Sequence, residues 1–422
     1  RRRGGRRVCL GYDGRLSSPA LARAAIGGFR DSGVDVLDIG LGPTPMLYYA
    51  VHAFEADGGL MVTASHNPPE FNGFKMMVGT DTLYGDGIAE LGRIAEAGDF
   101  ESGQGSIEDR PVLDEYVARV ARDYRGERPL TVAWDAGNGA AGEAMARLVT
   151  KLPGRHLLLN ERIDGTFPNH HPDPTVPENL VQLQDTVRAE GCDLGLAFDG
   201  DGDRIGAVDA NGGIVWADQL MVLYAAEVLE AAPGATIIAD VKASQVLYDE
   251  IARLGGTPLM WRTGHSLIKA KLKELGAPLA GEMSGHIFFA DRYYGYDDGL
   301  YAAVRLLGIL SRADTGLAEI CARMPAVVNT PELRIPCAEA RKFEIVEEVR
   351  QRLSEAGAAA GEVIAIDGVR VHTAEGWWLL RASNTQAVLV ARCEAADTAG
   401  LDRLRQQLGR QLEASGVRLP KF

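Results

Sequence analysis

A recurring pattern of strand, turn and helix constrains the fold of this chain most strongly. In each copy a short apolar strand runs into an Asp-containing turn and then an amphipathic helix, at residues 8–29, 131–148 and 236–254. A second strand follows, and then a third strand that ends in an unusual polar loop. These loops have the sequences LMVTASHNP, LGLAFDGDGDR and PLAGEMSGH, at residues 60–68, 194–204 and 278–286. Strands that alternate with helices predict βαβ units and a mainly parallel sheet.

The repeat length predicts the domain organisation. A recurrence of about 100 residues indicates three similar α/β domains rather than one large sheet. Residues 326–422 break the pattern, since their clustered strands and two helices indicate an α+β domain. The predicted fold class is therefore α/β, with three similar domains on mixed or parallel sheets and a C-terminal α+β domain around a central cleft. The expected domains are residues 1–110, 111–213, 214–325 and 326–422.

Composition and charge exclude several classes of protein. Apolar residues make up 46% and charged residues 24%, which excludes a disordered, collagen-like or coiled-coil chain. The formal net charge of −14 argues against nucleic acid or an anionic membrane as a partner. No apolar run approaches the roughly 18 residues that a membrane span requires. Five scattered cysteines without a C-x-x-C pair favour a reducing, cytoplasmic location.

The DGDGDR loop is the strongest local signal. Asp199, Asp201 and Asp203 would repel one another unless a cation lay among them, and the glycines let the backbone curl so that all three converge. A plain polar turn is the alternative. An EF-hand is excluded, because its sixth and twelfth positions would be Arg204 and Ala210. The pattern predicts Mg²⁺ that bridges to a phosphate oxygen.

The TASHNPP loop holds a candidate nucleophile. Ser65 lies in a tight turn after a strand, where two prolines restrict the backbone. His66 is expected to be a poor general base for it, because neighbouring side chains usually diverge. An ordinary strand-to-helix turn remains the alternative, and no G-x-S-x-G motif supports an α/β-hydrolase.

Two further loops carry groups that suit a sugar phosphate. The RASNT loop offers a guanidinium with hydroxyl and amide donors for a phosphate oxyanion, although this motif taken alone favours a polar hairpin tip. The GEMSGH loop offers Glu282, Ser284 and His286 to read sugar hydroxyls. Cations in or near the predicted loops, each of which could also be a solvated surface residue, are Arg15, Lys75, Arg204, Lys242, Arg262 and Lys269.

A Rossmann-like pattern supports a rival class. The glycines of residues 137–142 follow a strand and open a helix, and Glu161 lies 19 residues beyond Gly142. A nicotinamide-dependent oxidoreductase is therefore an alternative, but the triple-Asp loop has no role in hydride transfer. A tight strand-to-helix turn explains the glycines as well.

The ordered set of motifs resembles the α-D-phosphohexomutase family, in its bacterial phosphomannomutase/phosphoglucomutase branch. The motifs run along essentially the whole chain as TASHNP, NGFK, DGDGDR, DVK, TGHS, GEMSGH and RASNT. The resemblance implies four domains around one deep cleft. It also implies an isomerase that interconverts hexose 1-phosphates and 6-phosphates of mannose or glucose, through phosphoserine and a 1,6-bisphosphate. Glucose or mannose 1,6-bisphosphate would serve as activator.

The resemblance assigns roles to individual residues. It implies that Ser65 carries the phosphoryl group and completes an Mg²⁺ site with Asp199, Asp201 and Asp203. The other catalytic residues that it implies are Lys75, Arg15, His66 and Arg204. The substrate-binding residues that it implies are Lys242, His265, Glu282, Ser284, His286, Arg381, Ser383, Asn384 and Thr385. Lys342 is expected at the surface, as a control for Arg381.

Two departures from the family pattern bear on these expectations. The chain lacks the first family strand with its Tyr-Asp-x-Arg-Gly motif, so we expect that upstream residues are missing. Arg262 stands before TGHS where related sequences often have Lys, which keeps the charge. The expected partners are small sugar phosphates, without nucleic acid or membrane, and the chain is expected to be a monomer. Phosphoglucosamine mutase and an inactive sugar-phosphate-binding module remain alternatives.

Overall fold

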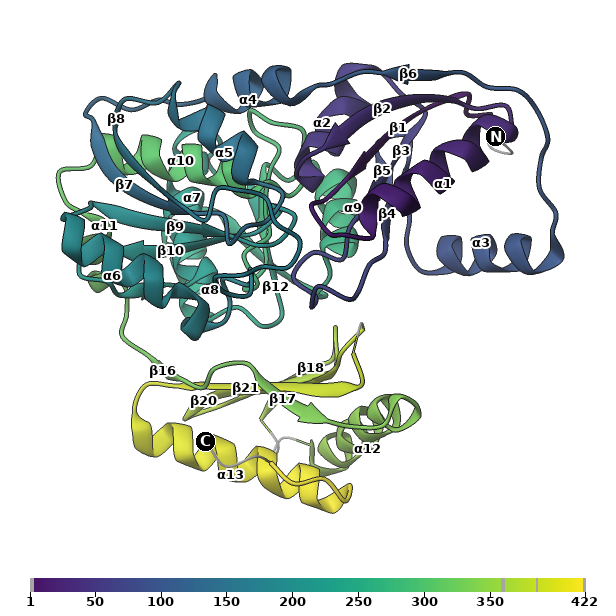
Figure 1. Ribbon diagram of the computed structural model, residues 1–422. Helices are drawn as coiled ribbons and strands as arrows, with labels where there is room; N and C mark the ends of the chain where they lie inside the picture. Colours follow the sequence, from purple (N-terminus) through teal and green to yellow (C-terminus); the bar gives the residue numbers. More distant parts are fainter. Residues whose placement is uncertain (1–3, 358–360, 385, 420–422) are drawn as a thin grey trace. The chain divides into compact units, whose positions relative to one another are not determined.

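The computed structural model describes residues 4–357, 361–384 and 386–419 (Figure 1). The chain forms two compact units. Unit 1 consists of Arg1–Ile238, Asp249–Leu259 and Gly264–Cys321. Unit 2 consists of Ala239–Tyr248, Met260–Thr263 and Ala322–Phe422.

The first sheet of unit 1 has six strands in the order β5-β4-β3-β1-β2-β6. They are β1 (Arg7–Tyr12), β2 (Asp35–Leu41), β3 (Gly58–Val62), β4 (Phe74–Val78), β5 (Asp81–Thr82) and β6 (Ile107–Asp109). The associated helices are α1 (Ser18–Asp31), α2 (Thr44–Ala53) and α3 (Asp86–Ala97). Helix α1 packs Ala22 and Ile26, one turn apart, on Leu10 and Val62 of the sheet (Figure 1). Helix α3 buries no residue.

The second sheet has five strands in the order β11-β10-β9-β7-β8. They are β7 (Leu130–Asp135), β8 (Gly154–Leu159), β9 (Leu194–Phe198), β10 (Ile205–Asp209) and β11 (Ile214–Val215). The helices that accompany it are α4 (Leu113–Ala121), α5 (Gly142–Val149), the 3-10 helix Pro177–Leu180 and α6 (Val181–Glu190). Strands β9 and β10 are antiparallel, so residues 199–204 form the turn between them.

The third sheet has the strand order β13-β12-β14-β15. Its strands are β12 (Thr236–Asp240), β13 (Thr257–Trp261), β14 (Leu279–Gly281) and β15 (Ile287–Phe289). The helices of this segment are α7 (Ala217–Ala231), α8 (Gln245–Arg253), α9 (His265–Leu275), α10 (Gly299–Arg312) and α11 (Leu317–Ala322). Asp298 caps α10 by accepting a hydrogen bond from the Tyr301 amide.

Unit 2 contains an antiparallel sheet in the order β16-β21-β20-β19-β18, with β17 paired to β21. Its elements are β16 (Val328–Asn329), β17 (Leu333–Pro336), α12 (Glu339–Ala356), β18 (Glu362–Ile364), β19 (Val369–Thr373), β20 (Gly376–Ala382), β21 (Val388–Ala395) and α13 (Thr398–Ala414). Helices α12 and α13 cover the same face of this sheet (Figure 1). Ile345, Val349, Leu404 and Leu408 pack there against Trp378.

The predicted α/β class with a C-terminal α+β segment is confirmed. Antiparallel strands are more numerous than the repeat indicated. Strands β4, β10 and β15 each return directly from a polar loop and pair antiparallel with the preceding strand. Their runs of three to five residues are too short to separate from a loop by pattern alone. The four domain boundaries stay a prediction.

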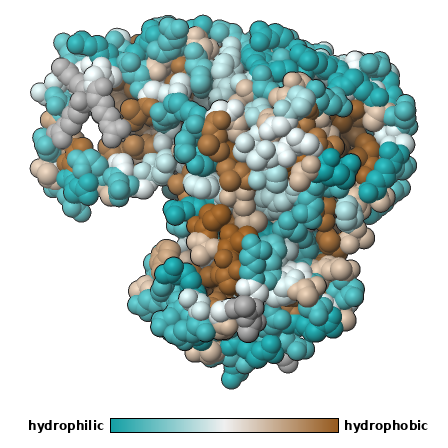
Figure 2. Space-filling model, turned by 180° about the vertical axis from the view of Figure 1, so that it is seen from behind, coloured by the Kyte–Doolittle hydropathy of each residue, from teal (hydrophilic) through white to brown (hydrophobic). Residues whose placement is uncertain are grey.

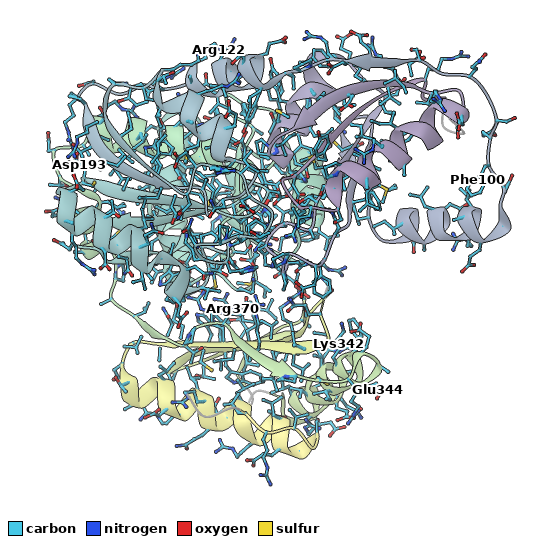
Figure 3. All side chains as sticks on the ribbon, viewed as in Figure 1. Phe100, Arg122, Asp193, Lys342, Glu344 and Arg370 are labelled. Carbon is cyan, nitrogen blue, oxygen red and sulfur yellow. The ribbon has the colours of Figure 1, made fainter. Side chains whose placement is uncertain are left out.

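One face of the molecule shows how polar and apolar residues are distributed over the surface. Figure 2 shows mostly hydrophilic side chains on the face that it presents, with smaller apolar groups between them. Phe100, which follows the exposed helix α3, is among the most exposed large apolar side chains (Figure 3). Within the described ranges, no helix combines the length and the apolar character that crossing a membrane would need.

Candidate active site

Ser65 lies in the loop that follows β3, in a backbone conformation that favours glycine. Its φ is +51°, which is uncommon for a residue with a side chain. The surrounding loop holds this conformation, because the Thr63 hydroxyl accepts a hydrogen bond from the Ser65 amide at 2.9 Å. The buried Arg15 guanidinium donates to backbone carbonyls of the same loop, those of Ser65, Asn67, Pro68 and Phe71. Arg15 therefore restrains the backbone of this loop through four hydrogen bonds.

The Ser65 hydroxyl has two side-chain partners. It donates to Asp199 Oδ2 at 2.7 Å, and it lies 3.3 Å from His66 Nδ1. The expectation that Ser65 and His66 diverge is thus wrong, because the positive φ of Ser65 turns the two side chains together. The charge of Arg204, and then burial, lower the pKa of His66 to about 3, so its imidazole is neutral at pH 7.

Asp199, Asp201 and Asp203 converge in the turn between β9 and β10. All three are fully buried, and one carboxylate oxygen from each lies within 4.8 Å of the others. Two glycines make this possible. A Cβ at Gly200 would lie 2.3 Å from the Ser65 carbonyl oxygen, and Gly202 has a φ of +76°. We call Ser65 and these three aspartates the carboxylate centre.

Lys75 on β4 is the cation nearest to this centre. Its ammonium contacts Asp201 Oδ2 at 2.7 Å and Asp203 Oδ2 at 2.5 Å. Burial would lower the pKa of Lys75, but the two aspartates outweigh it and raise that pKa well above its usual value. Burial, and then the charges of Asp201 and Asp203, raise the pKa of Asp199 well above its usual range. Arg204 Nε lies 3.8 Å from Asp199 Oδ2, so Lys75 and Arg204 bring two positive charges to three buried carboxyl groups.

The remaining oxygens of the centre fit a divalent cation. Asp201 Oδ1 and Asp203 Oδ1 are buried, and neither has a hydrogen-bond partner among the described residues. Buried carboxylate oxygens without partners are costly unless a cation binds them. Three carboxylates and a hydroxyl are the oxygen ligands that Mg²⁺ prefers. Sequence reasoning missed Thr44, which donates to Asp201 Oδ2 at 2.5 Å and fixes that carboxylate.

The GEMSGH loop approaches the same centre through Arg204. The Arg204 amide donates to Asp199 Oδ1 at 3.1 Å, and its Nε donates to His286 Nε2 at 3.0 Å. Ser284 donates to Glu282 Oε2 at 3.1 Å, and Glu282 Oε1 accepts from the Gly264 amide at 2.5 Å.

Asp297 is a charged residue of this site that the sequence reasoning did not find. Its buried carboxylate lies 2.8 Å from Lys269 Nζ, 2.9 Å from His286 Nδ1 and 3.3 Å from His265 Nδ1. Lys269 also donates to the Tyr48 hydroxyl at 3.2 Å. Two adjacent aspartates directly before the apolar helix α10 were the sequence signal for Asp297. Capping the helix uses only one of them, Asp298, so the other was a candidate for a different role.

Unit 2 holds the other predicted substrate-binding residues. Arg381 ends β20, and Asp367 Oδ2 accepts from its Nε at 2.9 Å. Arg381 Nη2 is buried and has no hydrogen-bond partner among the residues that the structure describes. Arg381 lies in β20, and Ser383 and Asn384 follow in the β20–β21 connection; because these three residues are predicted to bind phosphate, we call them the phosphate loop, and Thr385 lies outside the described residues.

Lys242 is also in unit 2, where it pairs with Glu332 at 3.0 Å. Burial opposes ionisation of Glu332, but Lys242 and then Arg334 outweigh it and lower the pKa of Glu332 to about 2.

The glycines of the Rossmann-like pattern already serve the protein backbone. A Cβ at Gly142 would meet the Glu161 carbonyl, and one at Gly139 would lie 2.9 Å from the Gly200 carbonyl oxygen. These glycines thus allow close packing beside the DGDGDR turn rather than leaving room for a dinucleotide.

Family models for all four domains of phosphoglucomutase/phosphomannomutase match the chain. Alpha/beta/alpha domain I matches residues 1–101, domain II residues 114–213, domain III residues 216–327 and the C-terminal domain residues 332–411. The fold and the site thus define a phosphohexomutase. The chain belongs to the phosphoglucomutase/phosphomannomutase family.

Individual relatives agree with this assignment. The phosphomannomutase/phosphoglucomutase of Pseudomonas aeruginosa is 46% identical over 98% of this chain and 89% of its own length. A phosphoglucomutase of Neisseria meningitidis is 43% identical over 97% of this chain and 89% of its own length. The crystal structure of a family protein from Burkholderia thailandensis superposes with a TM-score of 0.93 at 45% identity, covering 100% of this chain and 92% of that one.

Proposed function

We propose that this protein interconverts hexose 1-phosphates and hexose 6-phosphates of glucose and mannose through a phosphorylated Ser65 and a 1,6-bisphosphate. The observation that carries the proposal is the Ser65 hydroxyl, which is hydrogen-bonded to Asp199 at the edge of three converging buried carboxylates. A nucleophile beside a site for a divalent cation is what phosphoryl transfer requires.

Two phosphoryl transfers complete the reaction. In the first, the bond between Ser65 Oγ and phosphorus breaks, a bond from phosphorus to the sugar 6-oxygen forms, and the proton of the 6-hydroxyl passes to Ser65 Oγ. In the second, the bond from phosphorus to the sugar 1-oxygen breaks, Ser65 Oγ takes that phosphoryl group, and the Ser65 hydroxyl proton passes to the sugar 1-oxygen. The product is the hexose 6-phosphate, and the phosphoserine is restored. Glucose or mannose 1,6-bisphosphate supplies the first phosphoryl group.

Residues of both units are proposed to contribute to these two transfers. Asp199, Asp201 and Asp203 would hold Mg²⁺, which when bound neutralises charge on the transferring phosphoryl group. Lys75 lies against two of these carboxylates and brings a second positive charge to the same place. His66 Nδ1 lies 3.3 Å from the hydroxyl and the Arg204 amide donates to Asp199, while Glu282, Ser284, His265 and His286 are the groups proposed to read the sugar. The phosphate loop and Lys242 are proposed to bind the phosphate that is not transferred.

Phosphorus NMR of substrate mixtures tests the proposal. The purified chain is incubated with Mg²⁺, catalytic glucose 1,6-bisphosphate and, in turn, the 1-phosphates of glucose, mannose and glucosamine. We expect the 6-phosphates of glucose and mannose to appear. Conversion of glucosamine 1-phosphate alone would identify the chain as a phosphoglucosamine mutase. Binding of these ligands without conversion would identify an inactive sugar-phosphate-binding module.

A further inference from the structure

Lys342 on α12 is not the surface residue that the sequence indicated. Only 1% of its surface is exposed, whereas Glu344 on the same helix is exposed to solvent. Figure 3 shows both side chains on α12, with Lys342 on the side turned to the sheet. Burial follows from helix periodicity, since Lys342 shares a face with the core residues Ile345 and Val349.

Among the described residues, the ammonium of Lys342 contacts a carboxylate and a backbone carbonyl, and it lies 5.0 Å from the centre of the Phe343 ring. It lies 2.6 Å from the carboxylate of Glu339, which is exposed, and it donates to the Gln386 carbonyl oxygen at 3.0 Å. Lysine is seldom buried, because removing an ammonium from water is costly without strong partners. An ion pair with the exposed Glu339 could form at the surface equally well. The contact that requires burial is therefore the one with Gln386.

Gln386 connects Lys342 to the phosphate loop. The Gln386 amide donates to the Ser383 hydroxyl at 3.2 Å, and the Ser383 amide donates to the Val388 carbonyl at 3.0 Å. The Gln386 carbonyl accepts from both Lys342 and the Val388 amide, so both of its lone pairs are used. Fixing this carbonyl therefore restrains Gln386, the residue whose amide donates to the Ser383 hydroxyl.

We infer that Lys342 is a positioning residue, whose buried ammonium holds the phosphate loop in the conformation that binds the substrate phosphate. The inference rests on the proposed function, since it assumes that this loop binds phosphate. Lys342 acts through Gln386 and Ser383 rather than on the reacting atoms. Its loss should weaken binding of the sugar phosphate and leave the transfer at Ser65 largely intact.

Calorimetric titration with glucose 1-phosphate tests this inference. Lys342→Met keeps most of the aliphatic stem and removes the ammonium, and Lys342→Gln is a second, polar variant in case the first does not fold. We expect either variant to raise Kd about tenfold, which corresponds to about 1.4 kcal/mol, with KM rising in parallel and kcat within about twofold of the parent. Arg350→Met is the matched control, because Arg350 lies exposed on the same helix and pairs only with Glu347 among the described residues; its Kd should stay within about twofold.

The outcomes separate the two claims. A folded Lys342 variant with the parental Kd and KM overturns the positioning role, while turnover by the parent keeps the proposed function. A parent that binds glucose 1-phosphate without turnover contradicts the proposed function, and the ratio of Kd values still decides the role of Lys342. An equal fall in kcat and in thermal stability without a change in Kd would show that Lys342 is merely structural, and would also overturn the inference.

Discussion

The carboxylate centre of unit 1 and the phosphate loop of unit 2 hold charge of opposite sign. In unit 1, three buried carboxyl groups face one another; the Lys75 ammonium contacts two of them, and Arg204 Nε lies 3.8 Å from the third, Asp199. In unit 2, the Arg381 guanidinium is buried with one carboxylate partner, Asp367, and an Nη2 group that nothing in the described part of the protein satisfies. The first arrangement calls for a cation, and the second calls for an anion.

Under the proposed function, this difference assigns the two regions different tasks in one reaction. A site that concentrates carboxylates around a hydroxyl suits bond making and breaking at phosphorus, because a divalent cation there stabilises the transition state. A site that presents buried cationic and hydroxyl donors suits binding of a phosphate that stays intact. We therefore expect changes in the carboxylate centre to act mainly on kcat and changes in the phosphate loop to act mainly on KM.

The largest effect should come from Ser65→Ala. Removing a nucleophile should lower kcat by about four orders of magnitude or more, while the sugar phosphate still binds through unit 2. Steady-state turnover and calorimetric binding measure the two separately. Ser354→Ala, an exposed serine of α12, is the control and should retain parental turnover. A fully active Ser65→Ala protein would contradict the assignment of Ser65 as the nucleophile, and with it the distinction between the two regions.

Removal of metal should have the next largest effect. Chelation with EDTA should lower turnover by about two to three orders of magnitude, and added Mg²⁺ should restore it, because the three carboxylates otherwise face each other uncompensated. Mg²⁺ should also raise the unfolding temperature of the parent by binding the folded state. Asp201→Asn should lose much of that rise. Turnover that is indifferent to EDTA would contradict the assignment of the centre.

Arg381→Met tests the opposite region. Loss of a guanidinium that binds phosphate should raise KM about tenfold to a hundredfold, in line with a lost charged hydrogen bond, and should change kcat much less. Arg403→Met is the matched control, since Arg403 lies exposed on α13 and pairs with Glu375. A fall in kcat without a change in KM would reverse the division of labour between the two units.

The smallest effect concerns stability and pH. Burial raises the pKa of Asp298 to about 7, above its usual 3.8. Between these values the folded protein keeps a proton that the unfolded chain releases, so the free energy of unfolding falls as pH rises from about 4 to 7. Asp298→Asn cannot ionise, and relative to the parent it should gain about 1–3 kcal/mol between pH 5 and 8 in urea unfolding.

Glu332 in unit 2 supplies the contrast to Asp298. Since its folded pKa is lowered to about 2, its contribution to stability is present above its usual pKa of 4.5 and is lost as pH falls toward 2. Glu332→Gln should therefore differ from the parent least at low pH. Parallel pH profiles for the two variants would show that the regions do not differ in this way.

Much of the site could be predicted from the sequence, because its residues lie in short segments next to predicted strands. Ser65 and the three aspartates follow directly on buried strands, where the ends of a largely parallel sheet gather polar groups. Ser383 and Asn384 follow β20 in the same manner. The spacing of the three aspartates in DGDGDR, and the glycines between them, already predicted that the carboxylates converge. The glycines are needed because a close approach such as that of Gly200 to Ser65 leaves no room for a side chain.

The contacts that the sequence did not reveal depend on tertiary packing. Asp297 meets Lys269, His265 and His286 only because α9, β15 and the start of α10 come together. Lys342 has a polar helix neighbourhood in the sequence, and its burial depends on the β20–β21 connection that it contacts. The contacts of Arg15 were also hidden, since its guanidinium donates to four backbone carbonyls of the Ser65 loop as well as to the Asp13 carboxylate.

Intact-protein mass spectrometry tests the central claim most directly. The chain is measured before and after incubation with glucose 1,6-bisphosphate and Mg²⁺, and again after glucose 1-phosphate or mannose 1-phosphate is added. We predict one added phosphoryl group, mapped by peptide analysis to Ser65 and discharged by either sugar phosphate. A protein that never carries phosphate on Ser65, although it turns over these substrates, would contradict the phosphoserine mechanism.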